Sequence, residues 1–364
     1  MDGMRFGWLT LAHSPSPEAD QAAIDEQLIQ ACYAETVGFD GVWLTEHNFT
    51  GEAVYCDPIP FASAVAARTT RVRIGFAVIQ MALRHPIRLA VQLALLDNLS
   101  HGRIDVGVGR GSLYNEYEYV GYGLRSDDGP ERSAEAIEVM TRAWTEAPFS
   151  FAGKYYQVRL PELRPRPYQR PHPPLWRSVV TPRSFTECGR LGVPILTARV
   201  PLAVLPERLA LYEDGLRAGG HPEATRTRLR RDVAVWRHVY VGDSQAEAED
   251  DLAAAVLHTR RHMLHARAAY NPDDFHIAPA LLNPFNDPDV ADAEAVRWSL
   301  ETGALCGTAA RVAEQVAALR AAGVRHLLCQ MSFGYLAHDK ILASMRRFGE
   351  HVRPAFGAPP DQVS

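Results

Sequence analysis

The chain has 364 residues, of which 47% are apolar and 22% are charged, and its formal net charge is −5. A chain of this length and composition can bury a large core and is not typical of disordered proteins. The slight excess of acidic residues argues against nucleic acid and against an anionic membrane surface as the main partner.

The sequence also suggests where the protein resides. The first ten residues contain no basic segment followed by an apolar one, so we expect no signal peptide. No apolar stretch reaches the roughly 18 uninterrupted residues that a membrane span needs. The five cysteines are an odd number without CxxC spacing, which favours reduced thiols. We therefore expect a cytoplasmic protein.

Strand-like and helix-like patterns alternate along most of the chain. The expected strands are short apolar runs over residues 6–10, 41–45, 73–78, 104–109, 175–180, 194–198, 233–241 and 326–331. Helical patterns cover residues 20–37, 59–67, 87–99, 134–144, 183–191, 205–218, 245–265 and 311–322. Eight apolar strands alternating with helices are typical of a closed parallel barrel covered on its outside. The expected fold class is α/β, a (β/α)8 TIM barrel with insertions, although periodicity alone also permits an open, doubly wound sheet.

Two stretches interrupt this alternation, and we expect both to be insertions in a single domain of residues 1–355. In the insertion near 149–174, Phe149 to Arg159 predicts a hairpin, and residues 161–174 hold six prolines. Residues 271–301 are polar, contain Asn-Pro and Asp-Pro pairs, and are long enough to predict a mobile lid over the barrel. Residues 356–364 are expected to form a C-terminal tail.

Glu46 and His47 follow the second expected strand. In a TIM barrel the active site lies at the carboxyl ends of the strands. Imidazole is the side chain best suited to proton transfer near neutral pH. A lone histidine is more often structural, so only its position in the barrel favours a catalytic role for His47.

Two elements suited to an anion follow the fourth and fifth expected strands. Gly109 and Gly111 let the backbone approach a ligand, while Arg110 between them offers a fork of donors. Thr181 and Ser184 stand at an expected helix start, where free N–H groups favour an anion. Each pattern alone is common, but together they predict a phosphate-bearing ligand above these two strands.

Four motifs in this chain resemble the bacterial luciferase-like flavin-dependent monooxygenase family, and its α subunit in particular. They are GFDGVWLTEHNFT (38–50), His85-Pro86, LLDNLSHGR (95–103) and GVGRG (107–111). The resemblance implies a TIM barrel that uses reduced FMN (FMNH2) as a loosely held co-substrate. It also implies that O2 is captured as a flavin C4a-hydroperoxide, and that one oxygen atom is inserted into a small organic molecule. Such a two-component monooxygenase needs a separate NAD(P)H:flavin reductase, and we expect a homodimer.

The resemblance assigns the cofactor-binding residues as well. Arg110 and Arg132 would bind the FMN phosphate, together with Thr181 and Ser184. Gly109 and Gly111 flank that arginine in the same motif. The family has a non-prolyl cis peptide at the end of the third strand, which falls on Ala77–Val78 in this chain.

His47 would be the catalytic imidazole, with Glu46 in a supporting role. The chain departs from the luciferase pattern at Asn48, Val180 and Arg199, so light emission from a long-chain aldehyde is not expected. Arg199 is a candidate for binding an anionic or carbonyl-bearing substrate, although a structural arginine is the commoner case.

Aromatic side chains near the strand ends are candidates for a substrate pocket. Phe49 and Tyr114 are the candidates that we assign to substrate binding, and Trp8, Tyr55 and Tyr117 are further ones. Aromatic residues after strands are as often part of the plain core.

A metal site is not expected. His258, His262 and His265 lie on one face of a helix, but no carboxylate or cysteine joins them at ligand spacing. We place that helix in the outer ring of the barrel.

Two other functions remain open. One is a deazaflavin-dependent dehydrogenase, which shares the barrel and transfers hydride without oxygen. The other is a non-catalytic partner subunit like luciferase β, which the combination of His47, Arg110, Thr181 and Ser184 disfavours.

Overall fold

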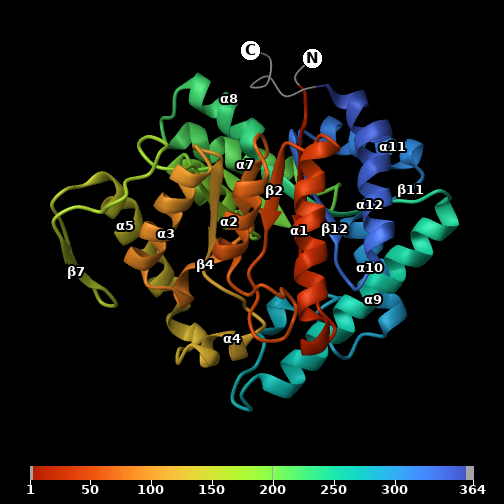
Figure 1. The fold of residues 1–364 in the computed structure, drawn as a ribbon, viewed down its shortest axis with the longest axis horizontal. Helices are drawn as coiled ribbons and strands as arrows, with labels where there is room; N and C mark the ends of the chain where they lie inside the picture. Colours follow the sequence, from red (N-terminus) through yellow and green to blue (C-terminus); the bar gives the residue numbers. More distant parts are fainter. Residues whose placement is uncertain (1–2, 199, 358–364) are drawn as a thin grey trace.

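The computed structural model describes residues 3–198 and 200–357, which fold around a closed barrel of parallel strands (Figure 1). In order around the barrel the strands are β1 (Arg5–Thr10), β2 (Gly41–Leu44), β3 (Arg73–Phe76), β5 (Ile104–Gly109), β8 (Leu175–Val179), β9 (Ile195–Ala198), β10 (Ala234–Val241) and β12 (His326–Ser332). Pairing of β9 with β10 and of β12 with β1 closes the ring. The (β/α)8 TIM barrel is thus confirmed, and the open sheet is excluded.

Helices surround the barrel (Figure 1). The expected ones are α1 (Asp20–Thr36), α2 (Pro58–Arg68), α3 (Pro86–Leu99), α5 (Gly129–Thr145), α6 (Pro182–Leu191), α7 (Leu205–Ala218), α9 (Gln245–Tyr270) and α11 (Ala309–Ala321). Four more were not expected: α4 (Glu116–Gly121), α8 (Glu223–Asp232), α10 (Asp292–Gly303) and α12 (His338–Arg347). The first is too short, and the second too rich in arginine, to show a clear apolar periodicity.

Trp43 of β2 fills the middle of the barrel. Its indole packs between two glycines of the neighbouring strands, and a Cβ on Gly7 would lie only 2.5 Å from Trp43 Cδ1. Trp176 of β8 meets it edge-on, with ring centres 5.5 Å apart. This interior layer consists of Leu9, Trp43, Trp176, Leu196, Ala234 and Leu328. Because these side chains fill the barrel, it is a packed core and not a channel.

The first insertion is the hairpin that the sequence predicts. Strands β6 (Phe149–Ala152) and β7 (Gln157–Leu160) pair antiparallel as a separate two-stranded sheet. A further short strand that is not part of the barrel ring, β4 (Ile79–Gln80), pairs with β5 at the carboxyl end of the barrel.

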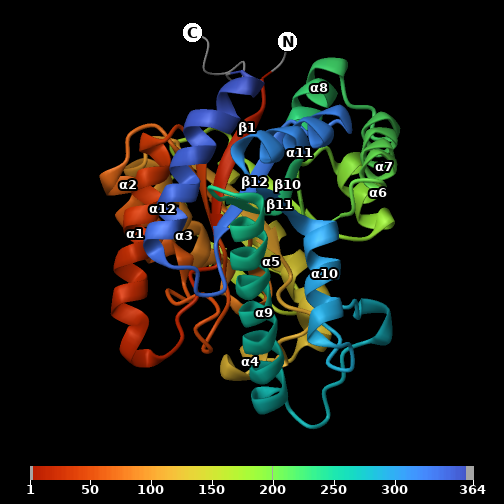
Figure 2. The same cartoon turned by 90° about the vertical axis from the view of Figure 1, so that its right-hand side faces the viewer.

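The segment between β10 and β12 differs from expectation in two ways. Helix α9 has 26 residues, about 39 Å at 1.5 Å per residue, and it extends past the strands toward α4 (Figure 2). The expectation that this helix stays in the outer ring was therefore wrong for its second half. Residues 292–303 of the expected loop form α10, and β11 (Ala304–Gly307) then adds to the end of β10.

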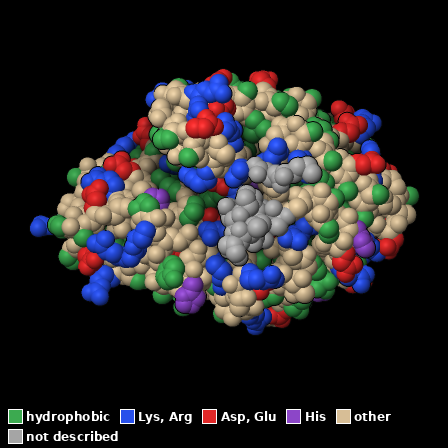
Figure 3. Space-filling view, turned by 90° about the horizontal axis from the view of Figure 1, so that it is seen from above, with side chains coloured by type: hydrophobic (Ala, Val, Ile, Leu, Met, Phe, Trp, Pro, Cys, Tyr) green, Lys and Arg blue, Asp and Glu red, His purple; other side chains and the backbone are tan. Residues whose placement is uncertain are grey.

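The two ends of the described chain meet at the amino ends of the strands, where Met4 N donates to the carbonyl of Phe356 at 3.2 Å. Acidic and basic side chains are interspersed over this face (Figure 3). Among the described residues, none of the helices has both the length and the apolar composition needed to span a membrane. The positions expected for the C-terminal tail lie mostly outside the described residues, at 358–364.

Candidate functional site

The polar side chains of interest gather at the carboxyl ends of the strands, an end of the barrel that we call the mouth. The loops that follow the strands line the mouth. The C-terminal end of α9 and the residues after this helix also reach the mouth. Tyr114 donates from its hydroxyl to the carbonyl of Leu281 at 3.0 Å. Tyr117 N donates to Asn271 Oδ1 at 3.1 Å. Residues 271–281 therefore lie at the mouth.

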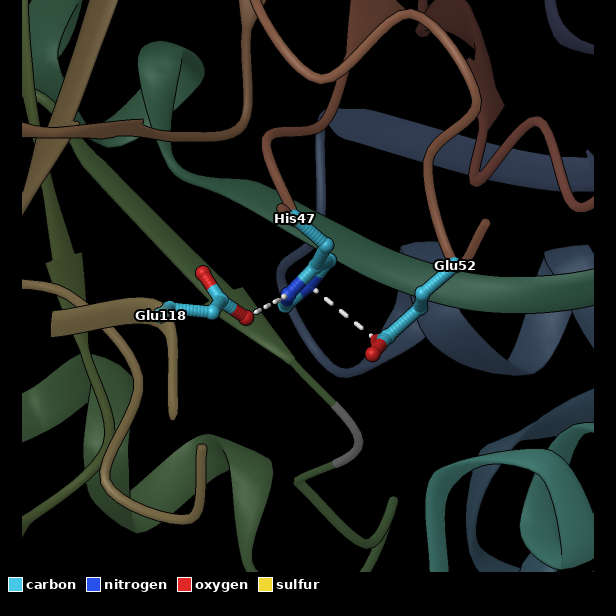
Figure 4. A group of neighbouring side chains, drawn as sticks. All are labelled: His47, Glu52 and Glu118. Carbon is cyan, nitrogen blue, oxygen red and sulfur yellow. Dashed lines mark hydrogen bonds and ion pairs between the residues drawn. The ribbon is translucent and has the colours of Figure 1, made fainter. Parts of the chain in front are cut away.

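His47 stands at the mouth between two buried carboxylates (Figure 4). Its Nδ1 lies 3.2 Å from Glu118 Oε1, and its Nε2 lies 3.3 Å from Glu52 Oε1. Burial alone would lower the pKa of this ring, but Glu52 and Glu118 outweigh it and raise the pKa to about 9. The ring is therefore protonated at neutral pH, because each nitrogen faces an anion.

Glu118 of α4 is fully buried and receives several hydrogen bonds. Asn115 donates to its Oε1 at 2.8 Å, and Asn48 donates to its Oε2 at 3.2 Å. Gln80 of β4 also donates to Oε2 through its side-chain amide. Burial raises the pKa of Glu118, but His47 and these amides more than offset it and hold the pKa below its usual value. The sequence analysis missed this residue, although two glutamates within a short, aromatic EYEY stretch were a usable signal.

Glu46 points away from the imidazole. Its carboxylate accepts from Arg84 Nη2 at 2.9 Å and from the backbone N–H of Gln80 at 3.0 Å. Burial is the largest influence on this group and raises its pKa to about 7, against the opposing effect of Arg84. It lines a separate polar cavity of about 250 Å³ with Asp57 and His85.

The glycine-rich turn after β5 lies beside the cis peptide Ala77–Val78 that the resemblance implies. A Cβ on Gly109 would lie 2.6 Å from Val78 Cγ2, so only glycine allows this approach. Gly111 has a φ of +125°, which side-chain-bearing residues rarely adopt. The intervening Arg110 is exposed, and its carbonyl accepts from the hydroxyl of Tyr119 at 3.0 Å.

Thr181 and Ser184 stand at the beginning of α6, as expected. Thr181 is the N-cap and accepts from Ser184 N at 3.3 Å; Thr181 is exposed and Ser184 is half-buried. Because β5 pairs with β8, this helix start and Arg110 follow neighbouring strands. Arg132 lies in the first turns of α5, with its guanidinium carbon 4.6 Å from the ring centre of Tyr155. No contact between Arg132 and the other three candidates is present among the described residues.

The proposed substrate-binding residues lie in different environments. Phe49 is 55% exposed and packs against Tyr122, with ring centres 5.2 Å apart. Tyr114 lies under the guanidinium of Arg267 at 4.8 Å. Arg199 lies outside the described residues.

The other aromatic candidates are more deeply placed. Trp8 faces the apolar layer between strands and helices, so it belongs to the plain core. Tyr55 stacks on Phe61 with ring centres 4.8 Å apart and accepts from Thr45 N through its hydroxyl. Tyr117 is buried near the mouth.

Arg267 of α9 is a buried cation that the sequence analysis missed. Its Nε donates to Asn115 Oδ1 and its Nη1 to Asn286 Oδ1, each at 2.9 Å. Within the described chain no carboxylate lies within 4.0 Å of it, and burial lowers its pKa. Asn115 also donates to Glu118, so α9 is linked to the His47 cluster through one amide.

His47, Glu52 and Glu118 also bring one donor atom each within 4.8 Å, a spacing that a divalent cation could use. We interpret the group as ion pairs, since a metal needs the lone pair of a ring nitrogen and both nitrogens here face carboxylates. His262 does not belong to a comparable group, but it lies at the mouth, because its Nδ1 is 2.9 Å from the Tyr335 hydroxyl.

Comparison with known proteins gives a consistent result. The model of the family described as luciferase-like monooxygenase matches residues 4–326. The oxygenase component of the flavin-dependent trigonelline monooxygenase of Acinetobacter baylyi is 25% identical, over 97% of this chain and 96% of that protein. The F420-dependent glucose-6-phosphate dehydrogenase of Microbacterium testaceum is 30% identical, over 65% of this chain and 68% of that protein. Among solved structures, the monooxygenase RslO1 of Streptomyces bottropensis is similar with a TM-score of 0.79 and 27% identity, over 97% of this chain and 100% of that one.

Proposed function

Because the chain belongs to the luciferase-like monooxygenase family, we propose that it is the oxygenase component of a two-component flavin monooxygenase. In this proposal a separate NAD(P)H:flavin reductase delivers reduced FMN, which supplies the electrons for activating O2. One oxygen atom then enters a small organic molecule. The proposal rests on one observation at the mouth. Two elements suited to an anion lie at neighbouring strand ends, on the same end of the barrel as a half-buried histidine that is paired with two buried carboxylates.

The residues at the mouth fit an FMN phosphate. The start of α6 offers backbone N–H groups and two hydroxyls. Arg110 follows β5 and adds a charged donor, which forms no ion pair with a carboxylate of the described residues. Gly109 leaves room beside Val78 where any other side chain would collide. We propose that Arg110, Thr181 and Ser184 hold the phosphate, with Arg132 nearby on α5.

Replacing Arg110 tests this assignment. Arg110→Ala should weaken binding of reduced FMN by about 1.5–3 kcal/mol, the usual contribution of a charged hydrogen bond. An anaerobic titration measures the dissociation constant. Arg183→Ala is the matched control, because Arg183 lies in the first turn of α6 but pairs with Glu187 at 2.6 Å and is exposed. Equal affinities for both variants would refute the phosphate site.

We propose that His47 acts as a proton donor. The sequence predicts that His47 transfers a proton, and a pKa of about 9 favours a ring that is already protonated at neutral pH. Such a ring can donate to an oxygen atom of the reacting molecule, and Glu118 keeps it oriented through Nδ1. General acid catalysis of this kind contributes about 10²- to 10⁴-fold.

His47→Gln should lower product formation by that factor while leaving reduced-FMN binding nearly unchanged. Candidate substrates come from a panel of small organic molecules screened by mass spectrometry for one ¹⁸O atom from ¹⁸O2. His265→Gln, an exposed histidine of α9, is the control and should keep full activity. Absence of ¹⁸O incorporation from every panel member, with reduced FMN bound, would count against an oxygenase.

The second candidate is a deazaflavin-dependent dehydrogenase, favoured by the 30% identity to the F420-dependent enzyme. The two functions differ in their need for oxygen. An oxygenase forms product only in air, whereas a dehydrogenase oxidises its substrate anaerobically when F420 is supplied. Turnover with F420 under argon would therefore replace our first proposal by the second.

A further inference from the structure

Two side chains beside His47 have buried polar atoms without a hydrogen-bond partner among the described residues. They are Nε2 of His13, in the loop after β1, and Oε2 of Glu52, in the loop after β2. Their exposed fractions are 8% and 2%. A buried polar atom without a partner destabilises the fold, so two such atoms close together need an explanation.

The loops that carry His13 and Glu52 lie side by side, because two backbone hydrogen bonds connect them. Ser14 N donates to the carbonyl of Gly51 at 2.8 Å, and Val54 N donates to the carbonyl of Ala12 at 3.0 Å. His13 and Glu52 thus stand opposite each other across this pair of bonds. Glu52 Oε1 meanwhile pairs with His47, so its second oxygen lies next to the proposed proton donor (Figure 4).

The proton of His13 can be placed from geometry. The backbone N–H of Gly334 donates to His13 Nδ1 at 2.8 Å, so Nδ1 must present its lone pair. The ring proton is therefore on Nε2, which makes the unpartnered atom a donor. Burial, with His262 and His47 nearby, lowers the pKa of this ring to about 3 and keeps it neutral.

Neighbouring side chains restrict the movement of the His13 ring. The ring of His262 stacks on it with centres 5.6 Å apart, and His262 is itself held by the hydroxyl of Tyr335 at 2.9 Å. With Gly334 N–H on its Nδ1 and His262 against its face, the His13 ring has little freedom to turn toward other partners.

We propose that His13 and Glu52 form a polar subsite for the molecule that the enzyme oxidises. The subsite takes a neutral group that both accepts and donates a hydrogen bond, namely the hydroxyl of an alcohol or phenol. An anion would satisfy His13 but repel Glu52, and a cation would satisfy Glu52 but leave His13 unpaired. A hydroxyl satisfies both atoms and places the molecule beside His47. This substrate class rests on the proposed function, although the subsite itself can be tested without flavin.

The test uses the full chain and four probes that share one ring: cyclohexanol, cyclohexanecarboxylate, cyclohexylammonium and methylcyclohexane. NMR of ¹⁵N-histidine-labelled protein reports the tautomer of His13 and the shift of its Nε2–H resonance as each probe is added. We expect cyclohexanol to shift this resonance saturably, and the other three to bind about tenfold more weakly or not at all, since one hydrogen bond is lost or replaced by repulsion.

Two variants make the test specific. His13→Phe keeps a ring but removes the donor, and should weaken cyclohexanol binding about tenfold. Glu52→Gln exchanges the acceptor for an amide that can donate, so it should shift the preference from cyclohexanol to cyclohexanecarboxylate. This reversal cannot come from a fold defect, which would lower the affinity for every probe. His351→Phe, at an exposed position far along the chain, is the control.

Equal binding of the four probes, or cyclohexanol binding that neither variant changes, would overturn the subsite and leave water as the partner of both atoms. Because no flavin is present, that result would not affect the proposed function. Conversely, hydroxyl-specific binding in a protein that fails to bind reduced FMN would support the subsite and refute the proposed cofactor.

Discussion

At the scale of single residues, His47 carries a pH dependence that can be measured without a substrate. Its pKa rises from 6.5 to about 9, because Glu52 and Glu118 outweigh the opposing effect of burial. A folded pKa above the unfolded one means that the charged ring stabilises the fold fully below about pH 6.5 and loses this effect as the pH rises through 9. We expect the free energy of unfolding to fall across this window by about 2–3 kcal/mol.

Urea unfolding at several pH values measures this loss. His47→Gln removes the titrating ring and should flatten the profile, whereas the exposed control His265→Gln should keep the wild-type profile. NMR titration of the ring gives its pKa directly. A value of 6.5 or lower would show that the two carboxylates do not hold His47 protonated.

The sequence identified His47 but not the residues that set its charge. His47 follows a strand in a recognisable motif, so its position alone drew attention to it. Glu52 and Glu118 lie in a loop and in a one-and-a-half-turn helix, 5 and 71 residues away in the chain, and only the folded barrel brings them to the ring. Side-chain pairs between loops leave no periodic signal in the sequence.

At the scale of elements, Arg260 of α9 organises the chain after that helix. It is 1% exposed and donates to Asp292 and to the carbonyls of residues 284, 285, 287 and 290. Arg260→Ala would remove this buried donor from all five acceptors, which are part-buried except for the fully buried carbonyl of Phe285. We expect a loss of about 3 kcal/mol or more in the free energy of unfolding, and faster hydrogen exchange over residues 284–292.

Arg261→Ala is the matched control for this prediction. Arg261 also binds Asp292, at 2.9 Å, but its side chain is 63% exposed. Surface ion pairs contribute about 0–1 kcal/mol, so this variant should remain close to wild type. Equal destabilisation by both substitutions would show that the carbonyl contacts of Arg260 contribute little.

Arg260 also sharpens the lid prediction. Residues 271–283 contact the mouth through Asn271 and Leu281, whereas residues 284–292 are fixed to α9. We predict that only 271–283 opens, and that hydrogen exchange there is faster than over 284–292. The sequence suggested one uniform loop, because Asn-Pro and Asp-Pro pairs mark turns without revealing which turn is held by a distant arginine.

At the scale of the whole molecule, Trp43 joins the strands from inside. It is 2% exposed, and its indole occupies the space left by Gly7 and Gly75. Trp43→Ala should lower the free energy of unfolding by about 3–5 kcal/mol, because it leaves a cavity in the centre of the barrel. Trp298→Ala, on half-buried α10, should cost less. Chemical denaturation measures both, and similar losses would contradict the central role of Trp43.

The barrel as a whole was predictable because each strand is a short, nearly continuous apolar run, buried on both faces. The extension of α9 past the strands was not predictable, since apolar periodicity indicates which side of a helix is buried but not how far the helix extends beyond the barrel. His262 was consequently placed on the outside, although it contacts Tyr335 at the mouth, and Arg267, which contacts Asn115 there, was missed. The homodimer stays a prediction, which sedimentation velocity can check.

The meeting of Met4 and Phe356 at the end of the barrel opposite the mouth has a practical consequence for engineering. A second protein fused beyond either residue would be tethered at the end of the barrel opposite the mouth, leaving the mouth open to diffusing molecules. A flavin reductase attached there would release reduced flavin close to the barrel. The local concentration of reduced flavin would then depend on the length and stiffness of the linker. The same adjacency favours circular permutation, since a short peptide could join the two ends without crossing the barrel.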